Sequence, residues 1–358
     1  MQTAEAAYRP NLLLHALLFV LTFFSIAWTC AAFAYDPVVL ERIAASSGFL
    51  EAQLHHIVLG LPYAILLSLF FLAHEFGHYF AARAHGVVAT LPYFVPMPLL
   101  GFGTFGAFMR MRSPIESRRV LFDIGVAGPL AGFIVALAYL IIGTIAFPGI
   151  EAIRLIHPEY GGIGSLPTWG IHFGGFLLLD IVAAVFTTHG SIAPPSNELY
   201  HFPLLAIGWV GMLVTSLNLL PFGQLDGGHI TYAMFGGRQK VLGRWAARLM
   251  LIAGLGFVAS LLLDATRTAS PDPVYTFLRG VFGPPLEWID RNASWWFKGS
   301  PMWLVWSLIV RLVVGVAHPP IPDETPLNRG RMVLGWIAIA ILVLTFSYSA
   351  IYEVARTS

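Results

Sequence analysis

Long apolar runs, separated by shorter polar stretches, dominate the chain. A helix needs roughly 20 predominantly apolar residues to cross a bilayer, and seven runs come close to that length or exceed it. The pattern therefore predicts an all-α polytopic membrane protein with about seven transmembrane helices. The first run is longer than a usual signal-peptide core, so we expect it to be retained. The seven runs cover residues 11–34, 57–83, 120–147, 201–222, 241–264, 301–317 and 332–352.

Composition agrees with a membrane protein and narrows the chemistry. Of the 358 residues, 57% are hydrophobic and 11% are charged, whereas a soluble domain has about 25% charged residues. The formal net charge of +1 offers no basic surface for nucleic acid. Cys30 is the single cysteine, which excludes a disulfide framework and a cysteine-based zinc site. Any metal must therefore be held by histidine, aspartate or glutamate.

A metal-binding pattern closes the second apolar run, where His74, Glu75 and His78 read H-E-x-x-H. On a helix, positions i and i+4 share one face, so both imidazoles can reach one zinc ion. Glu75 lies beside them and can take a proton from water. Two incidental histidines are the alternative. Ionisable side chains in lipid are costly, however, and their presence favours a functional site.

A third ligand is expected near the end of the fourth run. Asp226 fits best, because it sits in a glycine-rich turn that lets the backbone come close. His229 in the same turn is the alternative ligand, or else it supports the ligands through a hydrogen bond. Asn218 could bond a substrate carbonyl or an oxyanion, or it could cap the helix before Pro221.

The segment 86–117 does not fit a helix, because prolines interrupt its first half. Residues 101–111 alternate small and bulky side chains, which is typical of a strand or hairpin. Irregular backbone at membrane depth persists only when it is buried in protein or lines a wet cavity. We therefore predict a short re-entrant β-hairpin or loop beside the metal, with an ordinary interfacial loop as the alternative. In the next run, we expect Asp123 to pair with Arg118 or Arg119.

Together the two motifs resemble the site-2 protease family of intramembrane zinc metallopeptidases. The resemblance covers residues 57–230 and depends on His74–His78 together with Asn218–Gly227. It implies a three-helix catalytic core, one Zn²⁺ held by His74, His78 and Asp226, and Glu75 as the general base. The tail 318–327 is similar to that of bacterial and plastid members without an accessory domain. The chain has no obvious room for a PDZ or CBS domain.

These observations predict an intramembrane zinc metalloprotease that cuts transmembrane-helix protein substrates within the bilayer, in regulated intramembrane proteolysis. A metal-binding transporter and a catalytically inactive scaffold are the alternatives. A transporter site would lie between repeats, and no repeat is visible, while the intact Glu75 argues against a scaffold. We divide the chain into an N-terminal helix with an external loop (1–56), a catalytic membrane core (57–230) and C-terminal helices (231–358).

Lysine and arginine predict the orientation, because cytoplasmic loops are enriched in both. This places the N-terminus and the active site on the cytoplasmic side and, with seven spans, the C-terminus outside. The bacterial inner membrane is the expected location. The basic loops are 83–119, 223–244 and 318–331.

Overall fold

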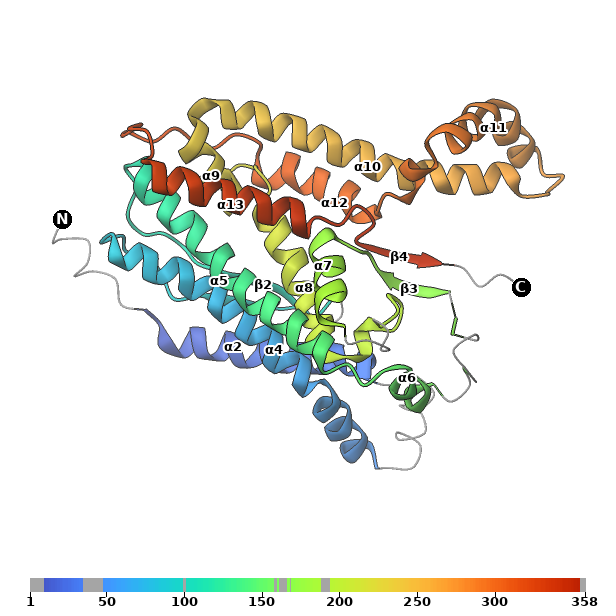
Figure 1. Cartoon of the computed structure of the whole chain (residues 1–358), viewed down its shortest axis with the longest axis horizontal. Coiled ribbons are helices and arrows are strands. Elements are labelled where there is room, and N and C mark those ends of the chain that lie inside the picture. The colour runs from blue at the N-terminus through green and yellow to red at the C-terminus, as the bar shows by residue number, and fades with distance from the viewer. Residues whose placement is uncertain are drawn as a thin grey trace.

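The computed structural model describes residues 10–34, 48–98, 101–157, 160, 166–167, 169–187 and 194–354. Four helices form the first packed group, in which α4 lies between α2 and α5 and α8 lies against α4 and α5 (Figure 1). Their cores are apolar, with Phe70 and Trp209 fully buried. The bounds are α2 Leu12–Ala34, α4 Phe49–Ala84, α5 Arg118–Ile145 and α8 Pro203–Asn218.

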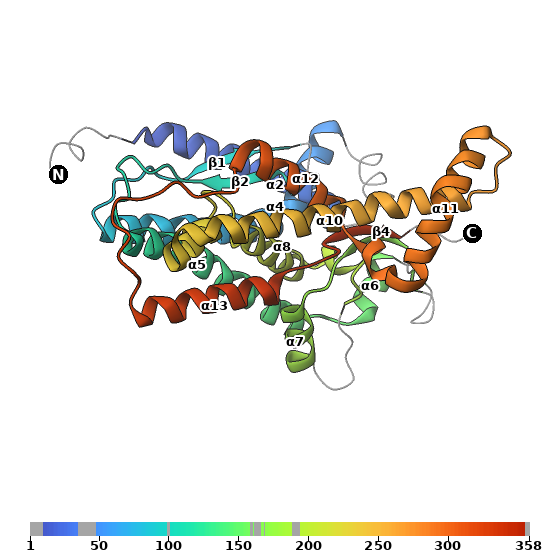
Figure 2. The same ribbon diagram turned by 90° about the horizontal axis from the view of Figure 1, so that it is seen from above.

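The second half of the chain covers this group. Helix α10 packs on α11 and α12, and α13 returns to contact α5, α7 and α8. Figure 2 shows α2 and α13 on opposite faces of the molecule. The bounds are α9 Asp226–Phe235, α10 Gln239–Arg267, α11 Pro273–Ala293, α12 Pro301–Ile309 and α13 Arg329–Thr345, with short η segments at Gly236–Arg238, Ser294–Lys298 and Val310–Val314.

The predicted count of seven transmembrane helices is not confirmed. Among the described residues, four helices are long and apolar enough to cross a membrane. A fifth is added if the pair Pro273–Lys298 and Pro301–Val314, bent by 66°, is one span. The remaining two predicted spans are the shorter helices α8, with 16 residues, and α13, with 17 residues. The four long helices are Leu12–Ala34, Leu50–Ala84, Arg118–Ile145 and Asp226–Arg267.

The fold is mostly helical but not all-α. Strands β1 (Tyr93–Pro96) and β2 (Thr104–Phe108) form an antiparallel hairpin in the segment predicted to be one. Strand β1 packs against α2. The depth of this hairpin in a membrane stays a prediction.

The sequence did not reveal a second pair, β3 (Gly170–Phe173) with β4 (Ile351–Val354). The last apolar run therefore ends as a helix at Thr345 and continues into a strand. The connection 148–200 also holds the short helices α6 (Ile150–Ile156), α7 (Leu177–Phe186) and η3 (Leu199–His201).

Small residues set the distance between α4 and α5. A side-chain carbon at Gly77 would come within 2.6 Å of the Ala127 carbonyl oxygen, and one at Gly128 would overlap the ring of His78. Close approach of small residues is the usual means of helix packing in membranes. It lets α5 support the face of α4 that carries the H-E-x-x-H residues.

Candidate metal centre

Three side chains from two helices converge at one point. The Nε2 atoms of His74 and His78 on α4 lie 3.2 Å apart. Asp226, the first residue of α9, places Oδ2 at 3.4 Å from His74 Nε2 and Oδ1 at 3.3 Å from His78 Nε2. The α8–α9 turn brings Asp226 there because Gly227 lies directly against the backbone of Leu219 and Leu220.

The spacing fits a tetrahedral metal ion. Ligand atoms at about 2.0–2.1 Å from a tetrahedral zinc stand about 3.3 Å apart. Here the two imidazole nitrogens are 3.2 Å apart, and each lies 3.3–3.4 Å from one of the two Asp226 oxygens. Two imidazole nitrogens and one carboxylate form a donor set typical of a divalent transition metal. The residues present therefore fit a zinc ion and leave a fourth position for water or substrate.

The protein also fixes the ring of His78. Its Nδ1 lies 2.7 Å from the carbonyl oxygen of Ile124 on α5. A carbonyl oxygen can only accept, so Nδ1 must carry the proton and Nε2 keeps its lone pair toward the centre. Metal-bound histidines are commonly oriented by such a bond. The absent side chain of Gly128 leaves the space that the ring occupies.

The centre opens into a cavity of about 790 Å³. Glu75 lines it beside the three candidate ligands, and the amide nitrogen of Asn218 lies 3.4 Å from His74 Nε2. His74, Glu75 and His78 are all less than 10% exposed, which means that the chemistry would take place away from bulk solvent. The rest of the wall includes residues 107–111, 113–115, 224–225 and 318–321.

His229 lies outside the group of three. Its Nδ1 lies 2.8 Å from Nε2 of His318, and its Cβ packs beside Gly125 of α5. His229 therefore supports the cavity wall and joins α9 to the loop 315–328. Sequence reasoning noted the similarity of residues 318–327 to the tail of site-2 protease family members but did not place this loop at the site. The signal available was the His318-Pro319-Pro320 run between two apolar segments.

The expected pairing of Asp123 with Arg118 or Arg119 is wrong. Asp123 accepts two bonds from Arg331, at 2.6 and 2.7 Å, and lies 2.9 Å from His85 Nε2. Arg118 instead donates to Glu324 at 2.7 Å. Both ion pairs fasten the start of α13 and its preceding loop to α5. A partner 208 residues away in the chain could not be chosen from local sequence.

Comparisons with known proteins agree with this geometry. The model of "Peptidase family M50" matches residues 62–261. Arabidopsis thaliana "Probable zinc metalloprotease EGY1, chloroplastic" is 31% identical over 80% of this chain and 42% of its own length. EGY2 of the same plant is 30% identical over 56% of this chain and 33% of its length. No solved structure matches.

The chain spans less than half the length of these curated relatives. Both relatives are named as chloroplastic proteins. The comparison therefore gives no support to the expected bacterial inner membrane, while the long apolar helices do indicate a membrane protein.

Proposed function

This chain belongs to peptidase family M50, the site-2 protease family, and on that premise we propose that it is a zinc metalloendopeptidase of membranes. Its substrates would be membrane proteins, cut within or near a transmembrane helix. The single observation that carries the proposal is the group His74, His78 and Asp226, with metal-ligand spacing, in one cavity with Glu75. The relatives' names, which describe probable zinc metalloproteases, point the same way.

His74, His78 and Asp226 would hold the zinc ion. When bound, zinc polarises a carbonyl as a Lewis acid and lowers the pKa of a water to about 7. The burial of His74 and His78 would limit water near the ion to what the cavity holds. The hydrogen bond from His78 to the Ile124 carbonyl oxygen would keep the His78 ring oriented toward the ion.

Glu75 would move the proton. Successive helical residues are offset by about 100°, so Glu75 does not point with the imidazoles and is free of the ligand role. It still lines the cavity beside them. We assign it to accept a proton from the attacking water and to deliver it to the leaving amine, as a general base and then acid.

Asn218 would hold the carbonyl oxygen of the scissile bond. Its amide nitrogen faces the centre near His74, and an N–H donor there can stabilise the negative charge that develops on that oxygen. The alternative role of Asn218, capping the helix before Pro221, agrees with its position as the last residue of α8. The two roles are compatible, because the backbone ends the helix while the side chain reaches the cavity.

The hairpin offers a binding edge for an unwound substrate. Arg110 and Arg112 use their backbone to pair with Thr90 and Val88. Because strand residues alternate in direction, the backbone groups of the odd residues 107, 109 and 111 point away from that partner. These same residues line the cavity. A substrate could therefore pair with this edge by β-augmentation.

The test uses Glu75→Gln, which keeps the size of the side chain but cannot act as a base. We expect normal zinc content and a loss of cleavage of about 10²–10⁴-fold, typical of losing a general base. The assay is a co-reconstituted single-span substrate, with the product identified by mass. Equal product from wild type and Glu75→Gln would contradict the proposed mechanism. A metal transporter would keep metal flux in the same variant.

A further inference from the structure

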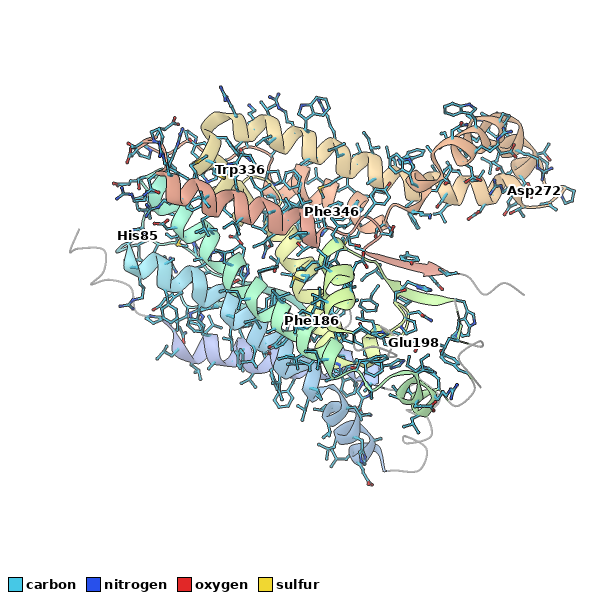
Figure 3. The ribbon with its side chains drawn as sticks, in the orientation of Figure 1. His85, Phe186, Glu198, Asp272, Trp336 and Phe346 are labelled. Carbon is cyan, nitrogen blue, oxygen red and sulfur yellow. The ribbon has the colours of Figure 1, made fainter. Side chains whose placement is uncertain are left out.

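A second group of buried metal-ligating side chains lies at the opposite end of the helical group. His157 follows α6, and Glu198 and His201 precede α8; all three are no more than 6% exposed. Figure 3 shows Glu198 far from His85, which caps the active-site end of α4. Among the described residues, this is one of two such groups of three with ligand atoms within 4.8 Å of one another.

The distances resemble those of the first centre. The two Nε2 atoms of His157 and His201 lie 2.9 Å apart. Oε2 of Glu198 lies 3.6 Å from the first of these nitrogens and 3.5 Å from the second. These values lie on both sides of the separation of about 3.3 Å expected between ligands of a tetrahedral zinc. The donor set is again two imidazoles and one carboxylate.

Hydrogen bonds turn the ligand atoms inward. His201 Nδ1 lies 2.7 Å from the carbonyl oxygen of Phe33, so this nitrogen must donate and Nε2 keeps its lone pair. Oε1 of Glu198 accepts from Tyr160 Oη at 3.2 Å and from Asn197 Nδ2 at 3.1 Å. The other oxygen, Oε2, therefore faces the two histidines. Such bonds from outside the ligand group are the usual support of a metal site.

A neutral histidine pair with no cation beside it explains this geometry less well. In a His157–His201 hydrogen bond, His157 would donate to the lone pair of His201 Nε2. That same lone pair would then face a carboxylate oxygen at 3.5 Å. Two acceptors facing each other in a buried place repel, whereas a cation between them turns the contact into a favourable one.

We propose that His157, Glu198 and His201 form a second zinc site with a structural role. The ion would join three segments, namely the end of α6, the turn before α8 and, through His201 and Phe33, the end of α2. Because the three ligands are buried, the ion acts on the fold and not on a substrate. It fastens the connection 148–200 to the catalytic core.

The experiment is metal analysis of the purified full chain in detergent by mass spectrometry. We expect about two zinc ions per chain in the wild type and about one in His78→Ala. Adding His201→Ala to His78→Ala should remove the remaining ion. In the otherwise native chain, Glu198→Gln removes one carboxylate charge with little change of shape and should lower the content to about one.

His172→Ala is the matched control, since His172 lies on β3 of the same region and outside the cluster. It should keep both ions. As a spectroscopic check, His78→Ala loaded with Co²⁺ should show visible absorption that disappears with His201→Ala. A wild-type chain with one zinc ion that His78→Ala removes would overturn this proposal and leave the proposed protease intact. A wild-type chain with one zinc ion that His78→Ala keeps and His201→Ala removes would support this proposal and contradict the proposed protease centre.

Discussion

At the scale of single residues, Gly128 sets the position of a candidate ligand. A methyl group there would overlap the ring of His78, so Gly128→Ala must shift either the ring or the α4–α5 contact. We expect zinc affinity to fall by about 10–100-fold, as it does when a group supporting a metal ligand is lost. Competition with a fluorescent chelator measures it.

The control for that variant is Gly280→Ala in α11, another helical glycine. A side-chain carbon at Gly280 meets nothing within 4 Å, so zinc affinity should stay unchanged. Wild-type affinity in Gly128→Ala would mean that the His78 ring does not depend on the space beside α5.

Asp226 and His229, the two candidates for the third zinc ligand, can be distinguished by measuring zinc binding in the same way. Asp226→Ala removes a carboxylate whose Oδ2 lies 3.4 Å from His74 Nε2 and whose Oδ1 lies 3.3 Å from His78 Nε2, and it should lose the His78-dependent zinc. His229→Ala should keep it, because His229 bonds to His318 and not to the centre. Zinc retained in Asp226→Ala but lost in His229→Ala would reverse the assignment of the third ligand.

At the scale of elements, the hairpin can be tested through its outer edge. Ala107→Pro and Met109→Pro each delete a backbone donor that we assign to the outer edge of the hairpin segment. Cleavage of a membrane-helix substrate should fall at least about tenfold while zinc content stays normal, since no ligand is touched. Met109→Ala keeps the donor and should cleave normally. Full activity in both proline variants would leave the segment as a wall of the cavity with no part in substrate pairing.

Local sequence patterns predicted the elements that carry the candidate site. They could not predict which distant segments pair with each other. The i, i+4 spacing placed His74 and His78 on one face, and the prolines and alternation of 92–111 indicated the hairpin. Strand β3 pairs with β4 across about half the chain, and four-residue strands leave too little alternation to recognise. Helix α11 lies between the predicted spans 241–264 and 301–317, where sequence reasoning placed no helix, and its two internal prolines disfavour one.

At the scale of the whole molecule, contacts between distant loops restrict the number of membrane crossings. Ser117 bridges Asp323, and β3 pairs with β4. Two segments that touch outside the membrane lie on the same side, so an even number of crossings separates them. With the four long helices alone, one crossing separates β3 from β4, which is an odd number. With the bent pair added, three crossings separate Ser117 from Asp323, which is again odd.

If α8 and α13 are both counted as spans, four crossings separate β3 from β4, and four separate Ser117 from Asp323. These even numbers support seven spans. Seven spans predict that reporter fusions after residues 115 and 238 read the cytoplasmic or equivalent side, and that fusions after residues 175 and 358 read the opposite side. The 175 and 358 fusions must agree with each other, because β3 and β4 form one sheet. If the fusions after residues 175 and 358 reported different sides, then either β3 and β4 do not pair or paired segments need not lie on the same side of the membrane. Agreement of all four sites would contradict seven spans, because among these spans α5 alone separates residue 115 from 175 and α8 alone separates residue 175 from 238.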